Sequence, residues 1–264
     1  MVNALNMSVS QNYAISVINL DRCAQRMERI GGHLDSLGLS YNRVPAIDGQ
    51  VDDLTQSPAQ YNPELNAKQF FVSLKQAEIA CFQSHYKALL GFVEQHEHQV
   101  LLVLEDDIEL MPGHHLHLPN VAAYMASEKP MLVKLYAKRA EPGRVISFPL
   151  EVGECILPNK VPLGFQAQMY NKAAANELLT KFKVFGRPID VEVQFWWRYQ
   201  TKILLLKPNL IRELSLEVGG STISPVPKPI TLAKINLELQ RPWFRLKLRL
   251  TSLYYRYHCK LLNK

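Results

Sequence analysis

The sequence predicts an α/β fold with a central, mostly parallel β-sheet. Short runs of aliphatic and β-branched residues alternate along the chain with longer segments whose apolar residues recur every three or four positions. One short run, residues 100–104, is entirely apolar, which is typical of a strand buried on both faces of a parallel sheet. Strands that alternate with helices predict a sheet covered by helices. At 264 residues, the chain is long enough for one main domain.

The N-terminal part of the chain is expected to form a strand, a helix and a second strand. Residues 13–20 are a β-branched run, and the apolar residues after them recur on one helical face as far as Gly38. Glycine at that position is typical of the end of a helix. A second strand is expected at residues 41–44, before the turn residues Asp48 and Gly49. This order is typical of the start of a nucleotide-binding α/β fold.

The middle of the chain is expected to contain a long helix followed by the most apolar strand. Ser73 and Gln76 form a capping-box pattern that predicts the start of this helix, which then ends near His96. The strand at residues 100–104 leads directly into three acidic residues, 105–107. Further strands are expected at residues 131–135, 165–170 and 203–206, and a further helix at residues 172–182.

The formal charge of +6 is concentrated at the C-terminal end. Residues 241–264 contain seven basic residues and no acidic one, with aromatic and leucine residues between the cations. The rest of the chain is close to neutral, which argues against a nucleic-acid-binding protein. We predict a domain of residues 1–225 and a separate basic tail of residues 226–264, joined by a loop or lid at residues 219–229. The tail suits adsorption to an anionic membrane surface, and the alternative is a helix docked on the body or on another subunit.

The cysteines and the N-terminus bear on the cellular compartment. The four cysteines are scattered and lack a metal-binding spacing, which is typical of reduced thiols in a cytoplasmic protein. The first residues lack the pattern of a secretion signal, and no apolar run reaches the roughly 18 residues that a membrane span needs. We therefore expect a cytoplasmic protein that does not cross a membrane.

The acidic run of Glu105, Asp106 and Asp107 is the strongest chemical feature of the sequence. Adjacent carboxylates repel one another when partly buried, and a divalent cation relieves this repulsion. Oxygen ligands suit Mg²⁺ or Mn²⁺, which can neutralise a diphosphate leaving group. The alternative is a solvated acidic run that caps the next segment. The position favours a binding site, because open α/β sheets bind ligands at the carboxyl ends of their strands.

Three separated segments occur in a recognisable order: VINLDR at residues 17–22, EIACFQSH at residues 78–85 and VLEDD at residues 103–107. Together they resemble glycosyltransferase family 25, the family of bacterial lipopolysaccharide glycosyltransferases and their collagen-modifying relatives. The second segment departs from the family pattern, because Ala80 stands in place of a glycine. Weaker similarity continues in the same order over residues 13–225.

The resemblance implies a GT-A type fold, a nucleotide-sugar donor and an inverting transfer that produces a β-linkage. It also implies a divalent metal, Mn²⁺ or Mg²⁺, held by Asp107 and Glu105, with Asp107 the direct ligand. The predicted donor site consists of Asn19, Leu20, Arg22, Arg26, Asp48, Ser84, His85, Glu105 and Asp106.

For several of these residues, a structural role is the alternative to a role in binding. Arg22 and Arg26 lie one turn apart at the start of the first predicted helix, where a phosphate can meet both guanidinium groups and the backbone N–H groups. The alternative is a solvated helix face, which we prefer for Arg29. For His85 the alternative is a structural histidine, and Cys81 is interpreted as a core thiol.

Inverting transfer requires a general base that takes the proton from the acceptor hydroxyl. Asp190, which follows Pro188 at the start of a short predicted helix, is the predicted base, and the alternative is a helix-capping role. Asp106 and Glu192 are the other candidates. Four aromatic residues follow Glu192, namely Phe195, Trp196, Trp197 and Tyr199. They are expected either to stack on the acceptor sugar or to belong to the core.

The acidic run and the resemblance together lead us to expect an enzyme, an inverting β-galactosyltransferase that uses UDP-galactose. Its expected acceptor is a lipid-linked oligosaccharide of lipopolysaccharide or lipooligosaccharide assembly, and its expected location is peripheral, on the cytoplasmic face of the inner membrane. A sugar nucleotidyltransferase is an alternative, but it requires a glycine- and lysine-rich loop that residues 19–22 do not supply. A non-catalytic carbohydrate-binding protein is the other alternative.

Overall fold

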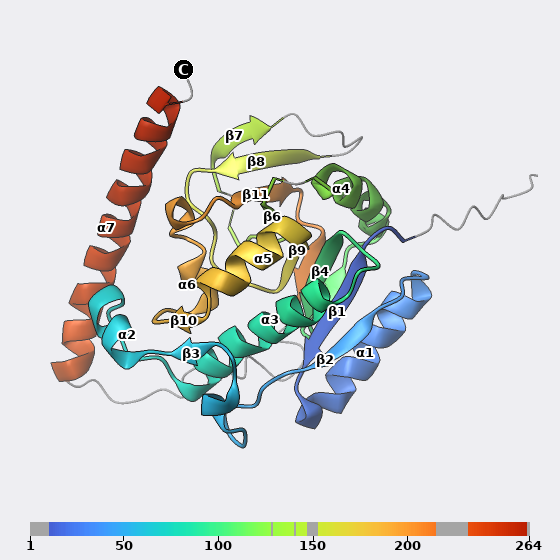
Figure 1. Cartoon of the computed structure of the whole chain (residues 1–264), viewed down its shortest axis with the longest axis horizontal. Helices are drawn as coiled ribbons and strands as arrows, with labels where there is room; N and C mark the ends of the chain where they lie inside the picture. The colour runs from blue at the N-terminus through green and yellow to red at the C-terminus, as the bar shows by residue number, and fades with distance from the viewer. Residues whose placement is uncertain (1–10, 128, 140, 147–152, 215–231, 263–264) are drawn as a thin grey trace, which may run out of the picture.

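A mixed β-sheet forms the centre of the protein (Figure 1). The computed structural model describes residues 11–127, 129–139, 141–146, 153–214 and 232–262. The sheet has eight strands in the order β2-β1-β4-β9-β6-β11-β8-β7. These strands are β1 (Ala14–Asn19), β2 (Asn42–Pro45), β4 (Val100–Glu105), β6 (Met131–Lys134), β7 (Gly143–Ile146), β8 (Glu154–Pro158), β9 (Ala167–Asn171) and β11 (Lys202–Lys207). Two small sheets pair β3 (Gln60–Tyr61) with β10 (Val184–Phe185), and β5 (Ile108–Leu110) with β12 (Ile211–Glu213).

The predicted α/β class is confirmed, but the prediction of a mostly parallel sheet is wrong. β1 is parallel to both β2 and β4, and β11 is parallel to β6. In contrast, β9 runs antiparallel to its neighbours β4 and β6, and the β7–β8 hairpin extends the sheet antiparallel to β11. An apolar run indicates burial on both faces, but it does not indicate strand direction, which depends on the neighbouring strands.

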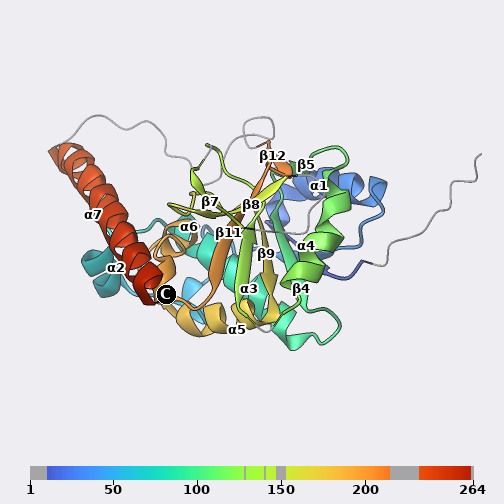
Figure 2. The same cartoon turned by 90° about the horizontal axis from the view of Figure 1, so that it is seen from above.

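Helices cover both faces of the sheet (Figure 2). On one face, α1 (Ala24–Ser36) and α4 (Leu118–Met125) pack Ile30, Leu34 and Val121 into one apolar cluster. On the other face, α3 (Gln76–Glu94) and α5 (Lys172–Lys181) pack Phe82 and Leu178 into a second cluster. Removing these side chains from water is the main favourable contribution to the fold, at about 25 cal/mol per Å² of apolar surface.

The long helix α3 begins later than the predicted capping box. Lys75, and not Ser73, occupies the N-cap position, and its backbone N–H donates to Glu78 Oε2 at 2.8 Å. Glu78 lies at the third helical position, from which a glutamate side chain reaches back to the N-cap amide.

The C-terminal segment forms a helix, α7 (Leu232–Leu262), that lies along one edge of the body beside α2 (Pro63–Gln69) and α6 (Ile189–Glu192) (Figure 1). Phe244 contacts Phe70 and Phe71, with ring centroids 5.3 and 5.4 Å apart. Further along, the ring of Tyr255 stacks on Trp197 at 5.3 Å. The docked-helix alternative therefore describes this segment.

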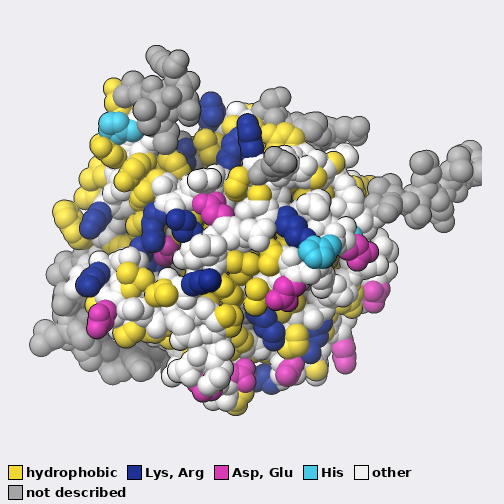
Figure 3. All heavy atoms as spheres, in the orientation of Figure 1, with side chains coloured by type: hydrophobic (Ala, Val, Ile, Leu, Met, Phe, Trp, Pro, Cys, Tyr) yellow, Lys and Arg dark blue, Asp and Glu magenta, His cyan; other side chains and the backbone are white. Residues whose placement is uncertain are grey.

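The outer side of α7 contains both apolar and basic side chains. Hydrophobic side chains lie among Lys and Arg side chains along this edge of the molecule (Figure 3). No helix in the described ranges is long and apolar enough to cross a membrane. The predicted loop at residues 219–229 and the domain boundary at residues 225 and 226 lie outside the described residues.

Candidate functional site

The acidic run lies at the centre of the molecule. Glu105 ends β4, between β1 and β9, and Asp106 and Asp107 form the turn before β5. The backbone fixes this turn, because Glu105 N donates to Gln166 O at 2.8 Å and Leu214 N donates to Asp107 O at 2.7 Å. The carboxylates are thereby held at the carboxyl end of a fully buried strand.

A first cavity of about 480 Å³ opens beside this turn. It brings together segments that are far apart in the sequence, from the end of β1, the loop after β2, the N-terminal half of α3 and the end of β4. Its lining includes nine residues predicted from the sequence for the donor or the metal: Leu20, Arg22, Arg26, Asp48, Ser84, His85, Glu105, Asp106 and Asp107.

Asn19 and Asp106 form a buried support beneath this cavity. Asn19 lies outside the cavity lining, and its Nδ2 donates to Asp106 Oδ2 at 2.7 Å. Arg26 NH1 lies 3.4 Å from Asp106 Oδ1, and Arg29 donates to the backbone oxygen of Asp106 at 2.6 Å. The solvated role preferred for Arg29 is therefore wrong. These contacts occupy the side chain of Asp106, which leaves Glu105 and Asp107 to face a ligand.

Other predicted donor-site residues are also positioned by hydrogen bonds. Arg22 pairs with Asp48 at 2.5 Å, on the more exposed side of the cavity. The hydroxyl of Ser84 accepts from Ile47 N at 2.9 Å and donates to Ala80 O at 2.7 Å, which joins α3 to the loop after β2. Ser84 thus holds the cavity wall in place.

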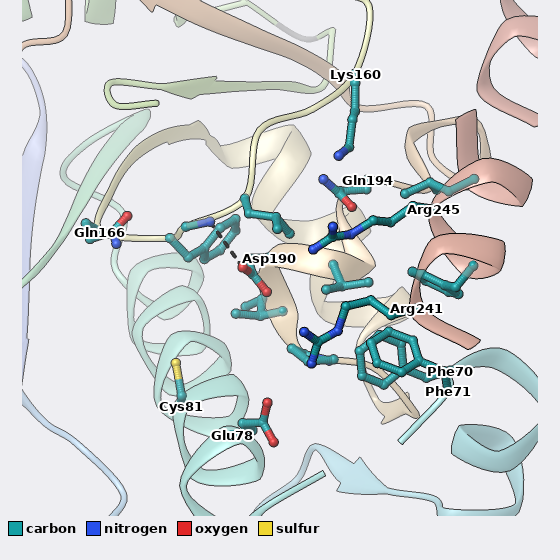
Figure 4. Close-up of a pocket in the computed structure, with 18 of the residues that line it drawn as sticks. Phe70, Phe71, Glu78, Cys81, Lys160, Gln166, Asp190, Gln194, Arg241 and Arg245 are labelled. Atoms are coloured by element: carbon teal, nitrogen blue, oxygen red, sulfur yellow. Dashed lines mark hydrogen bonds between the residues drawn. The ribbon is translucent and has the colours of Figure 1, made fainter. Parts of the chain in front are cut away.

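A second cavity, of about 380 Å³, is shown in Figure 4 and shares lining residues with the first. Cys81, Glu105 and Asp107 line both cavities, so Cys81 is not simply a core thiol. Asp190, the predicted base, lines the second cavity. Pro188 occupies the N-cap of α6, and Asp190 Oδ2 instead accepts from Gly164 N at 3.1 Å. The helix-capping alternative for Asp190 is therefore wrong.

The surroundings of the shared carboxylates favour their protonated forms. Burial, together with repulsion from Asp106 and Asp190, raises the pKa of Glu105 from 4.5 to about 8. Burial likewise raises the pKa of Asp107 from 3.8 to about 7, with a contribution from Glu105. Burial, the main cause of both shifts, disfavours the charged forms, and the neighbouring carboxylates add repulsion.

The same two residues fit a divalent metal. Asp107 Oδ1 is buried and has no hydrogen-bond partner among the described residues. Glu213 adds negative charge, since it contributes to the raised pKa of both Glu105 and Asp107. Carboxylate oxygens are the ligands that Mg²⁺ and Mn²⁺ prefer. Glu105 and Asp107 are therefore the residues that could hold such an ion.

His85 and Lys134 complete the polar floor of the site. His85 Nε2 lies 3.1 Å from Glu105 Oε1, and burial lowers the pKa of His85 to about 3, so the imidazole is neutral. Lys134, which is not among the residues predicted from the sequence, is buried and donates to the backbone oxygen of Gly164. Burial lowers its pKa to about 8. One feature of the sequence could have indicated Lys134, because it is the single charged residue in the otherwise apolar strand at residues 131–135.

Glu192 and the predicted acceptor-stacking aromatics have structural partners. Glu192 is buried and pairs with Arg187 and Arg198, so it is not exposed to a substrate. Trp196 Nε1 donates to Ser252 of α7 at 3.0 Å, and Phe195 packs against the guanidinium of Arg187. None of the four aromatic residues from 195 to 199 lines either of these cavities. Phe195, Trp196 and Trp197 contact α7 instead, and Tyr199 contacts Phe182 and Glu192.

The raised pKa values predict a pH-dependent response to metal. Between about pH 4 and 8 the folded protein retains protons that the unfolded chain has released, so the metal-free protein loses stability as the pH rises through this range. A cation binds the deprotonated carboxylates and competes with those protons. We expect Mn²⁺ to raise the melting temperature more at pH 8 than at pH 6, measured by differential scanning fluorimetry. Equal shifts at both pH values, or an undiminished shift in Asp107→Asn, would contradict this assignment.

Comparisons with known proteins agree with the geometry. Residues 12–137 match the family model of glycosyltransferase family 25 (LPS biosynthesis protein). Three insect proteins, each named "Glycosyltransferase 25 family member", are also similar. The Drosophila pseudoobscura pseudoobscura protein is 31% identical over 101 residues, or 37% of this chain and 16% of that protein. The Aedes aegypti protein is 34% identical over 109 residues, which is 40% of this chain and 17% of that protein. The Anopheles gambiae protein is 35% identical over 101 residues, which is 37% of this chain and 17% of that protein.

Proposed function

We propose that the protein, whose residues 12–137 match the family model of glycosyltransferase family 25, transfers galactose from UDP-galactose to a lipopolysaccharide or lipooligosaccharide acceptor, with inversion. The family supports a glycosyltransferase that binds a sugar donor and an acceptor. The matched segment is only about a sixth of the length of the curated relatives. Donor, acceptor and linkage are therefore our proposal, as are a GT-A type domain at residues 1–225 and a distinct tail at residues 226–264.

The observation that supports this function is the junction of two cavities at Glu105 and Asp107. In the proposal, the first cavity binds the nucleotide sugar, and Arg22 and Arg26 lie where they can meet its diphosphate. The second cavity binds the acceptor. The anomeric carbon of the donor then lies at the junction, where the two substrates meet.

Asp190 is the proposed general base. The acceptor hydroxyl oxygen forms a bond to the anomeric carbon while the bond from that carbon to the diphosphate oxygen breaks, and the hydroxyl proton passes to Asp190. The nucleoside diphosphate leaves with the bonding electrons. When bound at Glu105 and Asp107, a divalent cation supplies neutralisation of the charge on this leaving group. The buried support of Asn19 and Asp106 keeps the turn in place during the reaction.

A donor panel tests this function. The protein is incubated with UDP- and GDP-sugars, with Mn²⁺ or with EDTA, and the released nucleotide is measured. We expect metal-dependent release of UDP from UDP-galactose alone. If no nucleotide sugar is bound or turned over, the proposed function is wrong and the carbohydrate-binding alternative is favoured.

We also propose that α7 adsorbs to an anionic membrane on the cytoplasmic face, where a lipid-linked acceptor lies. Six apolar or aromatic side chains with exposed fractions of 47–69% recur along one side of this helix at spacings of one, three or four residues. Lys247 and Arg249 lie exposed on the same helix. Each cation near an anionic surface contributes on the order of 1 kcal/mol, and the aromatic side chains suit the interface. The six side chains are Trp243, Leu246, Leu250, Leu253, Tyr254 and Tyr257.

Vesicle flotation tests this membrane proposal. We expect the full chain to float with vesicles that contain phosphatidylglycerol, and expect the triple variant Trp243→Ser, Leu246→Ser, Leu250→Ser to stay largely in the soluble fraction. Val51→Ser, which removes an exposed side chain far from α7 in the sequence, is the matched control. Equal flotation of the triple variant and the control would show that this side of the helix does not bind the membrane.

A further inference from the structure

The inner side of α7 contributes two arginines to the second cavity. Phe244, Leu248 and Ser252 recur every four residues and contact or face the body, and Arg241 and Arg245 fall on the same side of the helix. Both arginines line the second cavity. Their side chains extend from α7 toward the carboxylate of Asp190 (Figure 4). This placement separates them from the cations on the outer side of α7.

The attachment of α7 holds these arginines in position. The ring of Phe244 packs against Phe70 and Phe71, and the guanidinium of Arg241 lies over the ring of Phe71 at 5.8 Å. One turn beyond Arg245, Leu248 is only 4% exposed. A guanidinium that is already positioned on a docked helix loses less conformational freedom when it binds a ligand.

The second cavity therefore contains both acidic and basic side chains. Its lining includes the carboxylates of Glu78, Glu105, Asp107, Asp190 and Glu213. Arg241, Arg245 and Lys160 form a basic wall on the side of α7, across from Glu78 (Figure 4). Within the described part of the chain, Lys160 and Arg245 form no ion pair. A third cavity of about 360 Å³ shares Lys160 and Arg245 and extends this basic wall toward Lys138 and Arg139.

A neutral sugar does not need three cations beside the general base. Arginine forks match the oxygens of a phosphate or carboxylate, and a charge-assisted hydrogen bond is roughly twice as strong as a neutral one. The donor diphosphate has its own cations, Arg22 and Arg26, in the first cavity, which neither Arg241 nor Arg245 lines. The basic wall thus lies on the acceptor side of Asp190.

We propose that the acceptor is an anionic saccharide, whose phosphate or carboxylate group binds Arg241 and Arg245, with Lys160, in the second cavity. This inference rests on the proposed function, and it adds the chemical class of the acceptor. It also assigns a role to residues outside 12–137, the segment that matches the family. The anion orients the saccharide so that one of its hydroxyl groups reaches Asp190.

Binding measurements on the full chain test the inference. Glucose 6-phosphate, glucuronate and glucose are titrated as probes by ligand-observed NMR, and UDP is titrated in parallel. We expect the two anionic probes to bind at least tenfold more tightly than glucose. The double variant Arg241→Gln, Arg245→Gln is expected to lose this preference while its affinity for UDP stays within twofold. Arg144→Gln, a change at an exposed arginine of β7 that lines none of the three cavities, is the matched control.

The outcomes separate this inference from the proposed function. Equal binding of glucose and glucose 6-phosphate, or an anion preference that the double variant retains, would overturn the anionic acceptor even if UDP-galactose is turned over. A loss of UDP affinity in the double variant would also overturn it, because the arginines would then bind the donor diphosphate. Arginine-dependent binding of the anionic probes without any nucleotide-sugar turnover would support the anion site and refute the transferase.

Discussion

Replacement of Asp107 by asparagine is expected to lower donor turnover by roughly two to three orders of magnitude, the loss typical when one preorganised charge-stabilising group is removed. Asparagine retains the shape of the side chain but not its charge. The turn itself is held through the backbone oxygen of Asp107, which accepts from Leu214 N at 2.7 Å, so the substitution leaves this contact in place. The measurement is metal-dependent release of UDP from UDP-galactose at saturating Mn²⁺.

Stability distinguishes a lost metal ligand from a damaged fold. Because burial raises the pKa of Asp107 to about 7, its charge at pH 8 destabilises the metal-free protein. Asp107→Asn should therefore melt at the same temperature as the unmodified protein or higher when metal is absent. The control is Asp35→Asn, which replaces an exposed aspartate on α1 and should leave the release of UDP unchanged. Full turnover by Asp107→Asn would exclude this carboxylate from the reaction.

Glu192→Gln is expected to lower the free energy of unfolding by about 3–5 kcal/mol, because it leaves a buried cation without its counter-charge. Glu192 is 5% exposed, and its carboxylate lies 3.2 Å from Arg187 NH1 and accepts from the hydroxyl of Tyr199 at 2.7 Å. Arg187 is itself only 3% exposed, and it packs on Phe195 at 3.8 Å and donates to Gln69 at the end of α2. This network joins α6 to the surface on which α7 docks.

Urea unfolding followed by tryptophan fluorescence measures the effect. The matched control is Glu97→Gln, an exposed glutamate whose replacement should change the free energy by no more than about 0.5 kcal/mol. A double change, Arg187→Met with Glu192→Leu, should recover part of the loss, because it removes both buried charges together. If Glu192→Gln instead retained its stability and lost turnover, Glu192 would be a catalytic candidate again.

Local sequence patterns predicted the elements that build the donor side of the site. The strand, helix and strand at the N-terminus are β1, α1 and β2, and the apolar run that precedes the acidic residues is β4. These elements could be predicted because apolar periodicity and turn residues act over a few neighbouring positions. The three family-like segments lie within residues 12–137, which match the family model. Eight of the nine predicted donor-site residues line one cavity, and Asn19 lies beneath it.

Only the tertiary structure determined the acceptor side. The direction of β9 depends on its pairing with β4 and β6, about 65 and 35 residues earlier in the chain. The burial of Lys134 beside Gly164 and the placement of Arg241 and Arg245 in the cavity of Asp190 likewise join distant segments. The sequence determined a basic, aromatic tail by composition alone. The docking position of α7 determines which of these cations face the body. That position depends on the packing of Phe244 against Phe70 and Phe71, a long-range contact that no local pattern specifies.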